Sequence, residues 1–193
     1  MNIVSLRWIV VASASASIMM VAGAQVIYGI LIPHLESELN TSRSLLSGVM
    51  SLYLLITGLG NLFAGRVADH YGPKRVILVG FLLMGVFTSI FSQVSSVVEV
   101  YLIYGVAIAF GSSCFGSTVL SKLVSSWFEE GRGLALSTYS IGFPIGQLIT
   151  APIAVYLILI LGWRGMLLTL GLLALVYGFG VVGSAVKARR VYH

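Results

Sequence analysis

The chain has 193 residues, of which 58% are hydrophobic and only 9% are charged. Its mean hydropathy is +1.03. A soluble domain of this length needs a largely polar surface, which eleven basic and six acidic side chains do not supply. The composition therefore excludes an ordinary soluble domain and favours the lipid bilayer as a partner of the chain.

The charge balance is basic, with a formal net charge of +5. Because the basic residues are scattered between apolar runs and form no single patch, we expect no nucleic acid partner. Cys114 is the one cysteine and lies within an apolar run. An intrachain disulfide is therefore impossible, and the cysteine content does not indicate a redox compartment.

The first apolar run begins near the N-terminus. Arg7 and the segment Ala22-Gly23-Ala24 resemble the basic region and the cleavage site of a signal peptide. However, the run continues from Trp8 to Ile32 and ends at Pro33, and these roughly 25 residues are enough to span a hydrocarbon core of about 30 Å. We therefore favour an uncleaved membrane helix.

Six apolar runs are long enough to cross a bilayer, and each must be helical because lipid offers no hydrogen-bond partners to an open backbone. Asn40, Thr41 or Ser42 is suited to cap the second helix. No linker or low-complexity tract interrupts the runs, so we expect one domain over residues 1–193. The predicted fold is all-α, with transmembrane helices at residues 8–32, 45–64, 76–94, 98–122, 132–158 and 164–185.

The distribution of basic residues predicts the orientation of these helices. If they alternate in direction, only Arg43 and Arg164 of the eleven Lys and Arg residues fall on one side. The positive-inside rule then places both termini and the 65–75 connection in the cytoplasm. We expect an integral protein of an inner or plasma membrane.

Polar side chains at membrane depth are the candidates for a solute cavity. Small residues such as Ser13 and Ser17 are explained by close helix packing, whereas a carboxamide or a phenol needs a partner or a water-filled cavity. No Asp, Glu, Lys, Arg or His occupies the central third of any run, and we expect Lys122 to extend toward the membrane surface. The candidate cavity residues are Gln25, Tyr28, Tyr101, Ser112, Tyr139 and Gln147.

Small residues at four-residue spacing indicate where helices approach closely. Gly60 and Ala64 follow this pattern in the second run, and Gly142 and Gly146 follow it in the fifth. Pro144 removes a backbone donor, so we expect the fifth helix to kink there and to free a carbonyl one turn back.

The segment 111–117, Gly-Ser-Ser-Cys-Phe-Gly-Ser, raises the alternative of an intramembrane serine protease of the rhomboid kind. Such an enzyme needs a histidine base within reach of its serine. His34, His70 and His193 all lie in connections or at the terminus. The sequence therefore predicts no enzymatic activity, no cofactor and no metal site.

The densest charge in the chain lies between the second and third runs, from Gly65 to Arg75. Its pattern, Gly-x-x-Ala-Asp-x-x-Gly-x-Lys-Arg, resembles the signature loop of the major facilitator superfamily. His70 stands where Arg or Lys is usual, and Tyr101 stands where many members carry an arginine. Further features are similar to the monocarboxylate and oxalate/formate antiporter branch: Tyr28-Gly29 with Pro33, Tyr104-Gly105, Trp127-Phe128 before Gly131-Arg132-Gly133, and Gly162-Trp163-Arg164.

The resemblance implies a symporter or antiporter that moves a small organic anion, such as a monocarboxylate, by alternating access. It also implies that six helices form two inverted three-helix repeats. A gating role is implied for the 65–75 connection. Gly65 and Gly72 would permit a tight turn, and Asp69 would latch onto a helix N-terminus in a second half. The cations of Lys74 and Arg75 would anchor the topology and neutralise Asp69.

The family has twelve helices in two halves, whereas this sequence provides one half. Three accounts are open: the first half of a truncated or split carrier, a parallel homodimer, or a non-transporting scaffold or regulator. A carrier for a different small solute is a further alternative. The expected partners are the bilayer, a small organic anion, and a second six-helix half supplied by a separate chain or a homodimer mate.

Overall fold

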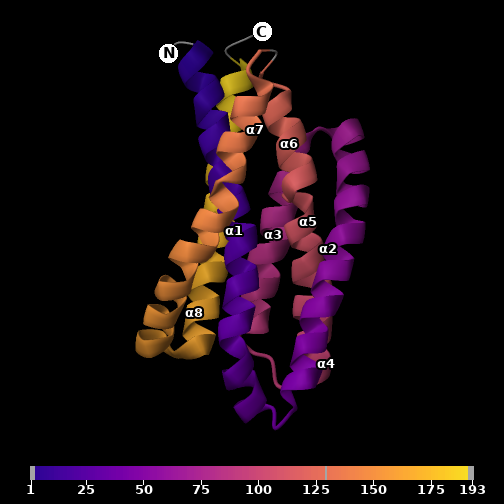
Figure 1. Ribbon diagram of the computed structural model, residues 1–193, viewed down its shortest axis with the longest axis vertical. Helices are drawn as coiled ribbons and strands as arrows, with labels where there is room; N and C mark the ends of the chain where they lie inside the picture. Colours follow the sequence, from indigo (N-terminus) through magenta and orange to yellow (C-terminus); the bar gives the residue numbers. More distant parts are fainter. Residues whose placement is uncertain (1–2, 129, 191–193) are drawn as a thin grey trace.

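A computed structural model describes residues 3–128 and 130–190 of the chain. Every regular element in these ranges is helical, and together they form one elongated bundle (Figure 1). The elements are α1 (Ile3–Glu38), α2 (Arg43–Tyr71), α3 (Pro73–Phe91), α4 (Val97–Val100), the π-helix η1 (Tyr101–Ile108), α5 (Ala109–Cys114), α6 (Ser117–Ser125), α7 (Arg132–Ser140) and α8 (Gly142–Arg190).

Five helical stretches among the described residues are long and apolar enough to cross a membrane, and the fifth divides into two arms, which makes six segments. Helices α1, α2 and α3 supply the first three, and the stretch Val97–Ser125 supplies the fourth. Helix α8 contains two arms, because Gly162 has φ 71° and ψ 167° and interrupts the helical backbone. The chain reverses there, and the two arms run back along each other (Figure 1). The all-α membrane fold expected from hydropathy is thus confirmed.

Two helices extend beyond their predicted ends. Helix α1 passes through Pro33 and continues to Glu38, although we expected it to stop at the proline. Helix α2 continues to Tyr71, so the connection to α3 is Gly72 alone, with φ 84°, followed by a proline in the first turn of α3. The predicted capping segment is correct, since the Ser42 side chain accepts a 3.4 Å hydrogen bond from the backbone of Leu45.

The fourth membrane segment is broken, whereas the sequence suggested a continuous helix over 98–122. A capping box between Ser96 and Glu99 starts it, and the backbone then becomes π-helical in η1. Helix α5 ends at Cys114, and α6 starts at Ser117. Phe115, with φ −126° and ψ 27°, leaves the helical conformation between them.

The fifth membrane segment is interrupted one turn before Pro144. Helix α7 ends at Ser140 and α8 begins at Gly142. Because the proline has no N–H to donate four residues back, the backbone carbonyl of Ser140 loses its usual partner. The break between α7 and α8 thus lies next to the proline at which the sequence predicted a kink.

Glycines bring the helices of the bundle into backbone contact. A Cβ atom at Gly142 would lie 2.5 Å from the carbonyl oxygen of Ser15, and one at Gly146 would lie 2.6 Å from the Cα of Met19. These positions join α8 to α1, as the four-residue spacing predicted. Gly80 of α3 approaches α5 in the same way, since its Cβ would lie 2.8 Å from a backbone oxygen.

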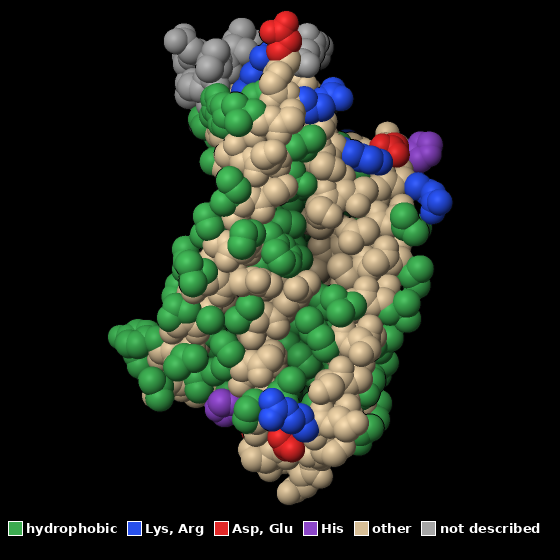
Figure 2. All heavy atoms as spheres, in the orientation of Figure 1, with side chains coloured by type: hydrophobic (Ala, Val, Ile, Leu, Met, Phe, Trp, Pro, Cys, Tyr) green, Lys and Arg blue, Asp and Glu red, His purple; other side chains and the backbone are tan. Residues whose placement is uncertain are grey.

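The surface of the bundle matches a bilayer. Large apolar side chains project from the helices along their length; Leu148 is 76% exposed and Leu159 is 79% exposed. On the face shown in Figure 2, the coloured charged side chains gather at the two ends, and apolar side chains cover the part between them. Such an apolar band between charged ends is what the hydrocarbon core requires.

Candidate functional site

One end of the bundle holds an ion pair between α2 and α6. The Lys122 ammonium lies 2.7 Å and 2.8 Å from the two carboxylate oxygens of Asp69, and it also donates a 2.8 Å hydrogen bond to the carbonyl of Gly65. The side chains are 63% exposed for Asp69 and 37% exposed for Lys122. We expected Lys122 only to extend toward the membrane surface. In the structure it also joins α2 to α6 through its ion pair with Asp69.

The other residues of the predicted gating connection lie around this ion pair. Gly65 is inside α2 and not at a turn, and a Cβ there would lie 3.1 Å from the Thr118 side chain, so its small size permits the approach of α6. Gly72 makes the turn, where its positive φ favours glycine. The Lys74 ammonium lies 5.9 Å from the centre of the Trp127 ring, and Arg75 is exposed.

A second group of polar side chains lies near mid-length in three membrane segments. The hydroxyl of Tyr53 on α2 faces the side chains of Ser112 on α5, Thr57 on α2 and Gln25 on α1. Tyr53 and Ser112 are completely buried, and their hydroxyls lie close to each other, yet neither forms a hydrogen bond of good geometry. Buried polar atoms are nearly always paired, so two poorly paired hydroxyls at the same place make this group a candidate site.

We call Gln25, Tyr53, Thr57 and Ser112 the polar cluster. Two of its members, Gln25 and Ser112, were predicted from the sequence as cavity residues. Gln25 is half-buried and forms the accessible edge of the cluster. Tyr53 and Thr57 were missed, although their four-residue spacing on one face of a helix was a usable signal.

The other predicted cavity residues lie outside this cluster, and the three tyrosines among them bind backbone carbonyls. Tyr28 and Tyr101 donate hydrogen bonds of 2.7 Å and 2.8 Å to the first turn of α2, at the carbonyls of Leu46 and Leu45. Tyr139 donates a 3.3 Å hydrogen bond to Ser117 beside the break in the fourth segment. Gln147 is half-buried on α8. The six predicted residues therefore do not converge on one pocket.

Aromatic stacking fixes the helices on one side of the polar cluster. The Tyr104 ring stacks on Tyr28 with a centroid distance of 4.2 Å and on Tyr53 with a distance of 5.0 Å. The hydroxyl of Tyr104 donates a 3.0 Å hydrogen bond to the carbonyl of Ala24. These contacts hold the Tyr53 ring in place, and they preorganise its hydroxyl toward Ser112 and Gln25.

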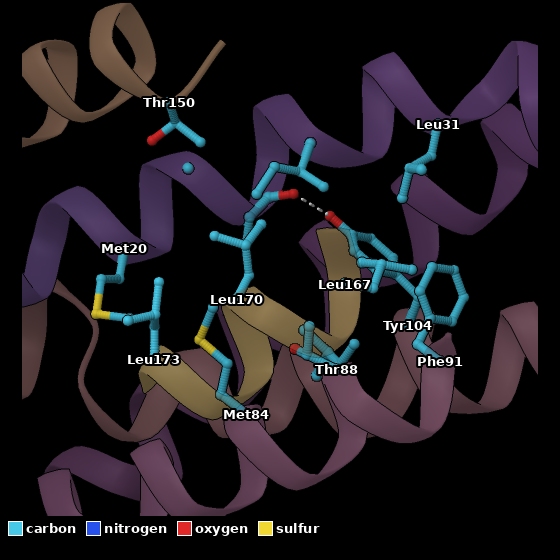
Figure 3. A pocket seen from close by; sticks show the side chains of 14 residues that line it. Met20, Leu31, Met84, Thr88, Phe91, Tyr104, Thr150, Leu167, Leu170 and Leu173 are labelled. Carbon is cyan, nitrogen blue, oxygen red and sulfur yellow. Dashed lines mark hydrogen bonds between the residues drawn. The ribbon is translucent and has the colours of Figure 1, made fainter. Parts of the chain in front are cut away.

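A separate cavity of about 150 Å³ lies between α1, α3, η1 and the two arms of α8. Figure 3 shows Met20, Met84 and Leu173 at one end of it and Leu31 and Phe91 at the other. The lining is almost wholly apolar: Met20, Gly23, Ala24, Ile27, Leu31, Met84, Thr88, Phe91, Tyr104, Ile108, Thr150, Leu167, Leu170 and Leu173. None of the six predicted cavity residues belongs to it.

The opposite end of the bundle is closed by a network around Arg164. Its guanidinium lies 2.6 Å from a carboxylate oxygen of Glu38 and donates hydrogen bonds of 2.9 Å and 3.0 Å to the carbonyls of Ser92 and Val94. Trp163 donates a 2.9 Å hydrogen bond to the other oxygen of Glu38. The network joins the end of α1, the end of α3 and the second arm of α8.

Metal chemistry finds no support in the geometry. Across residues 3–128 and 130–190 there is no group of three or more His, Cys, Asp or Glu side chains that could hold a metal ion.

The apolar band, the charged ends and the six crossing segments define a helical membrane protein. Residues 14–191 match the model of the Major Facilitator Superfamily, and the chain belongs to this superfamily.

Among the relatives are transporters of three kinds. The chain is 24% identical over 147 residues to the probable L-galactonate transporter of Escherichia coli, 26% identical over 164 residues to monocarboxylate transporter 2 of mouse, and 30% identical over 148 residues to the 4-hydroxybenzoate transporter PcaK of Pseudomonas aeruginosa. These matches cover 76%, 85% and 77% of the chain but 32%, 34% and 33% of the relatives. The chain therefore spans about a third of their length.

Proposed function

We propose that the chain forms one six-helix half of an alternating-access transporter for a small organic anion with a carboxylate group. The observation that carries this proposal is the family membership, together with relatives whose names specify galactonate, monocarboxylates and 4-hydroxybenzoate. All of these solutes bear a carboxylate. The shared chemistry is therefore more informative than any single relative.

The polar cluster supplies suitable groups for such a solute. A carboxylate accepts hydrogen bonds, and hydroxyl and amide donors in a low-dielectric interior bind it more strongly than they would in water. Tyr53 and Ser112 have unpaired hydroxyls, and Gln25 lies at the accessible edge. We propose that the carboxylate enters past Gln25 and receives hydrogen bonds from these residues, with side-chain rotation opening the way.

We assign gating to the segment 65–75, which comprises the end of α2, Gly72 and the start of α3. In the proposed transporter, Asp69 alternates between Lys122 within this half and a helix N-terminus of a second half. Both termini and this connection face the cytoplasm in our proposal, as the basic residues indicate. A second copy of the chain could take the place of the second half, and a scaffold that transports nothing is the competing function.

Uptake into liposomes tests the proposed function. The purified chain is reconstituted alone, and uptake of labelled lactate or benzoate is compared with that of lactamide or benzamide, which differ chiefly in lacking the charge. Saturable uptake of the acids but not of the amides supports a carboxylate carrier working as a homo-oligomer, and crosslinking in the same liposomes identifies the dimer.

If neither acids nor amides enter, thermal unfolding with each solute decides the remaining question. Stabilisation by lactate or benzoate and not by the amides supports a carboxylate-binding half that requires a second polypeptide. Stabilisation by neither class contradicts the proposed substrate and favours the scaffold.

Removing the unpaired hydroxyl of Tyr53 should separate stability from binding. We expect Tyr53→Phe to leave the free energy of unfolding unchanged or to raise it by about 1 kcal/mol, because a buried hydroxyl without a partner is unfavourable. Carboxylate binding should nevertheless weaken, since one donor is lost. Thermal unfolding with and without benzoate measures both effects, and Tyr71→Phe, at the exposed end of α2, is the control. A large loss of stability would show that the hydroxyl has a structural partner.

The ion pair should matter for gating more than for stability. Exposed ion pairs contribute about 0–1 kcal/mol, so Asp69→Asn and Lys122→Gln should unfold within about 1 kcal/mol of the unmodified chain. If Asp69 latches, both changes should alter the rate of carboxylate uptake. Glu36→Gln, which changes a carboxylate near the other end of the bundle, should not. If Asp69→Asn and Lys122→Gln take up carboxylate at the same rate as Glu36→Gln, the ion pair only joins two helices and has no role in gating.

A further inference from the structure

The apolar cavity has a closed end and an open rim. Leu31 and Phe91 at one end are completely buried, and Tyr104 is 3% exposed. At the other end, Leu173 is 54% exposed, and Met20 and Thr150 are half-buried. Figure 3 shows the lining side chains distributed between these two ends along α1. The cavity is thus a blind apolar tunnel that opens on the outer surface of the bundle.

The rim lies among exposed apolar side chains between the charged ends of the bundle. Met20, Thr150 and Leu173 come from α1 and from the two arms of α8, away from the charged residues at the ends of the bundle. The neighbouring Leu172 and Leu148 are 59% and 76% exposed. In a bilayer these positions face lipid tails, so the molecules that reach the rim are lipid acyl chains.

The chemistry of the walls selects the same class of ligand. An empty apolar cavity of about 150 Å³ stays dry and can bind a small hydrocarbon. The hydroxyl of Tyr104, which reaches the wall, is already engaged with the carbonyl of Ala24. No carboxylate or cation lines the cavity, and the hydroxyls of Thr88 and Thr150 are the remaining side-chain polar groups in a lining that is otherwise apolar.

We propose that this cavity is a binding site for the acyl chain of a bilayer lipid, which enters between the arms of α8 and ends near Phe91. The site is distinct from the polar cluster, because none of the cluster's residues lines the cavity. An inserted chain would fill the space that α1, α3 and the second arm of α8 leave between them, and would restore the contacts that an unfilled space lacks.

Photolabelling from within the bilayer tests the proposal. The chain is reconstituted in phosphatidylcholine vesicles that contain a small fraction of phosphatidylcholine with a diazirine in one acyl chain. Helix α3 provides its own reference, because Val86 and Ile90 are 44% and 45% exposed to lipid, whereas Met84 is 7% exposed and Phe91 is completely buried. We expect label at Met84 and Phe91 as well as at Val86 and Ile90.

Two variants at one position control the experiment. Thr88 lines the middle of the cavity, so Thr88→Phe should fill it and remove the label from Met84 and Phe91 while Val86 remains labelled. Thr88→Val keeps the volume and should keep the label. Thermal unfolding verifies that both variants are folded. The labelling pattern of the unmodified chain tests the proposal without any variant. Label confined to Val86 and Ile90 in the unmodified chain would overturn the proposal, whatever the uptake experiments show.

Discussion

Gly146→Ala should destabilise the bundle by about 1–3 kcal/mol, because the added methyl group meets backbone and not a movable side chain. The new Cβ would lie 2.6 Å from both the Cα and the carbonyl oxygen of Met19, so α1 and α8 must separate. The separation would spread along the crossing, since Gly142 makes the same kind of contact one turn away. Thermal unfolding in detergent or in liposomes measures the loss.

The matched control is the same substitution where space is open. A Cβ at Gly58 would have no neighbour within 4 Å, and this residue lies in the middle of α2. Gly58→Ala should therefore stabilise the chain by about 0.5–1 kcal/mol through the higher helix propensity of alanine. The two variants differ in sign although the chemical change is identical. Equal stability of the two variants would show that the α1–α8 crossing is looser than the structure indicates.

The number and class of the membrane segments could be predicted because hydropathy reports them directly. The ends of the helices could not, since a helix that leaves the hydrocarbon is no longer marked by apolar residues. Helix α2 continues through Arg66, Asp69 and His70, which are polar but compatible with a helix. The predicted loop was therefore too long, and Gly65 was assigned to a turn that is made by Gly72.

Features that depend on residue spacing along one helix were predicted better than pairings between particular residues of different helices. Residues four apart lie on the same face of a helix, so the spacing of Gly142 and Gly146 predicted that a neighbouring helix approaches there. The structure confirms this close approach. By contrast, Asp69 and Lys122 are 53 positions apart, and Glu38 and Arg164 are 126 apart. Only the packing of the helices brings such pairs together. A single sequence does not encode that packing in a readable pattern.

The polar cluster could be predicted in part from the sequence. Gln25 and Ser112 stood out because they interrupt apolar runs, but a tyrosine such as Tyr53 resembles an interfacial or packing residue. Its importance comes from burial without a partner, which is visible only in three dimensions. The face formed by Tyr53 and Thr57, four residues apart, was the available signal.

The network around Arg164 leads to the last prediction. Arg164→Met should lower the free energy of unfolding by about 1–2 kcal/mol. This is the lower part of the range for hydrogen bonds to a charged group, because the Arg164 side chain is 41% exposed. The loss comes mainly from the carbonyls of Ser92 and Val94, whose residues are buried and would lose their donor. Arg164→Lys should recover only part of the stability, since an ammonium cannot reproduce the planar fork that reaches three acceptors.

Arg43→Met provides the control, because it removes the same charge at the start of α2, where the arginine side chain is exposed. It should change the free energy of unfolding by less than about 0.5 kcal/mol. Thermal unfolding of the three variants at two salt concentrations separates the two contributions of Arg164. Its attraction to the Glu38 carboxylate should weaken with salt, whereas the hydrogen bonds to Ser92 and Val94 should persist. If Arg164→Met proved as stable as Arg43→Met, the ends of α1, α3 and α8 would be held together by apolar packing alone.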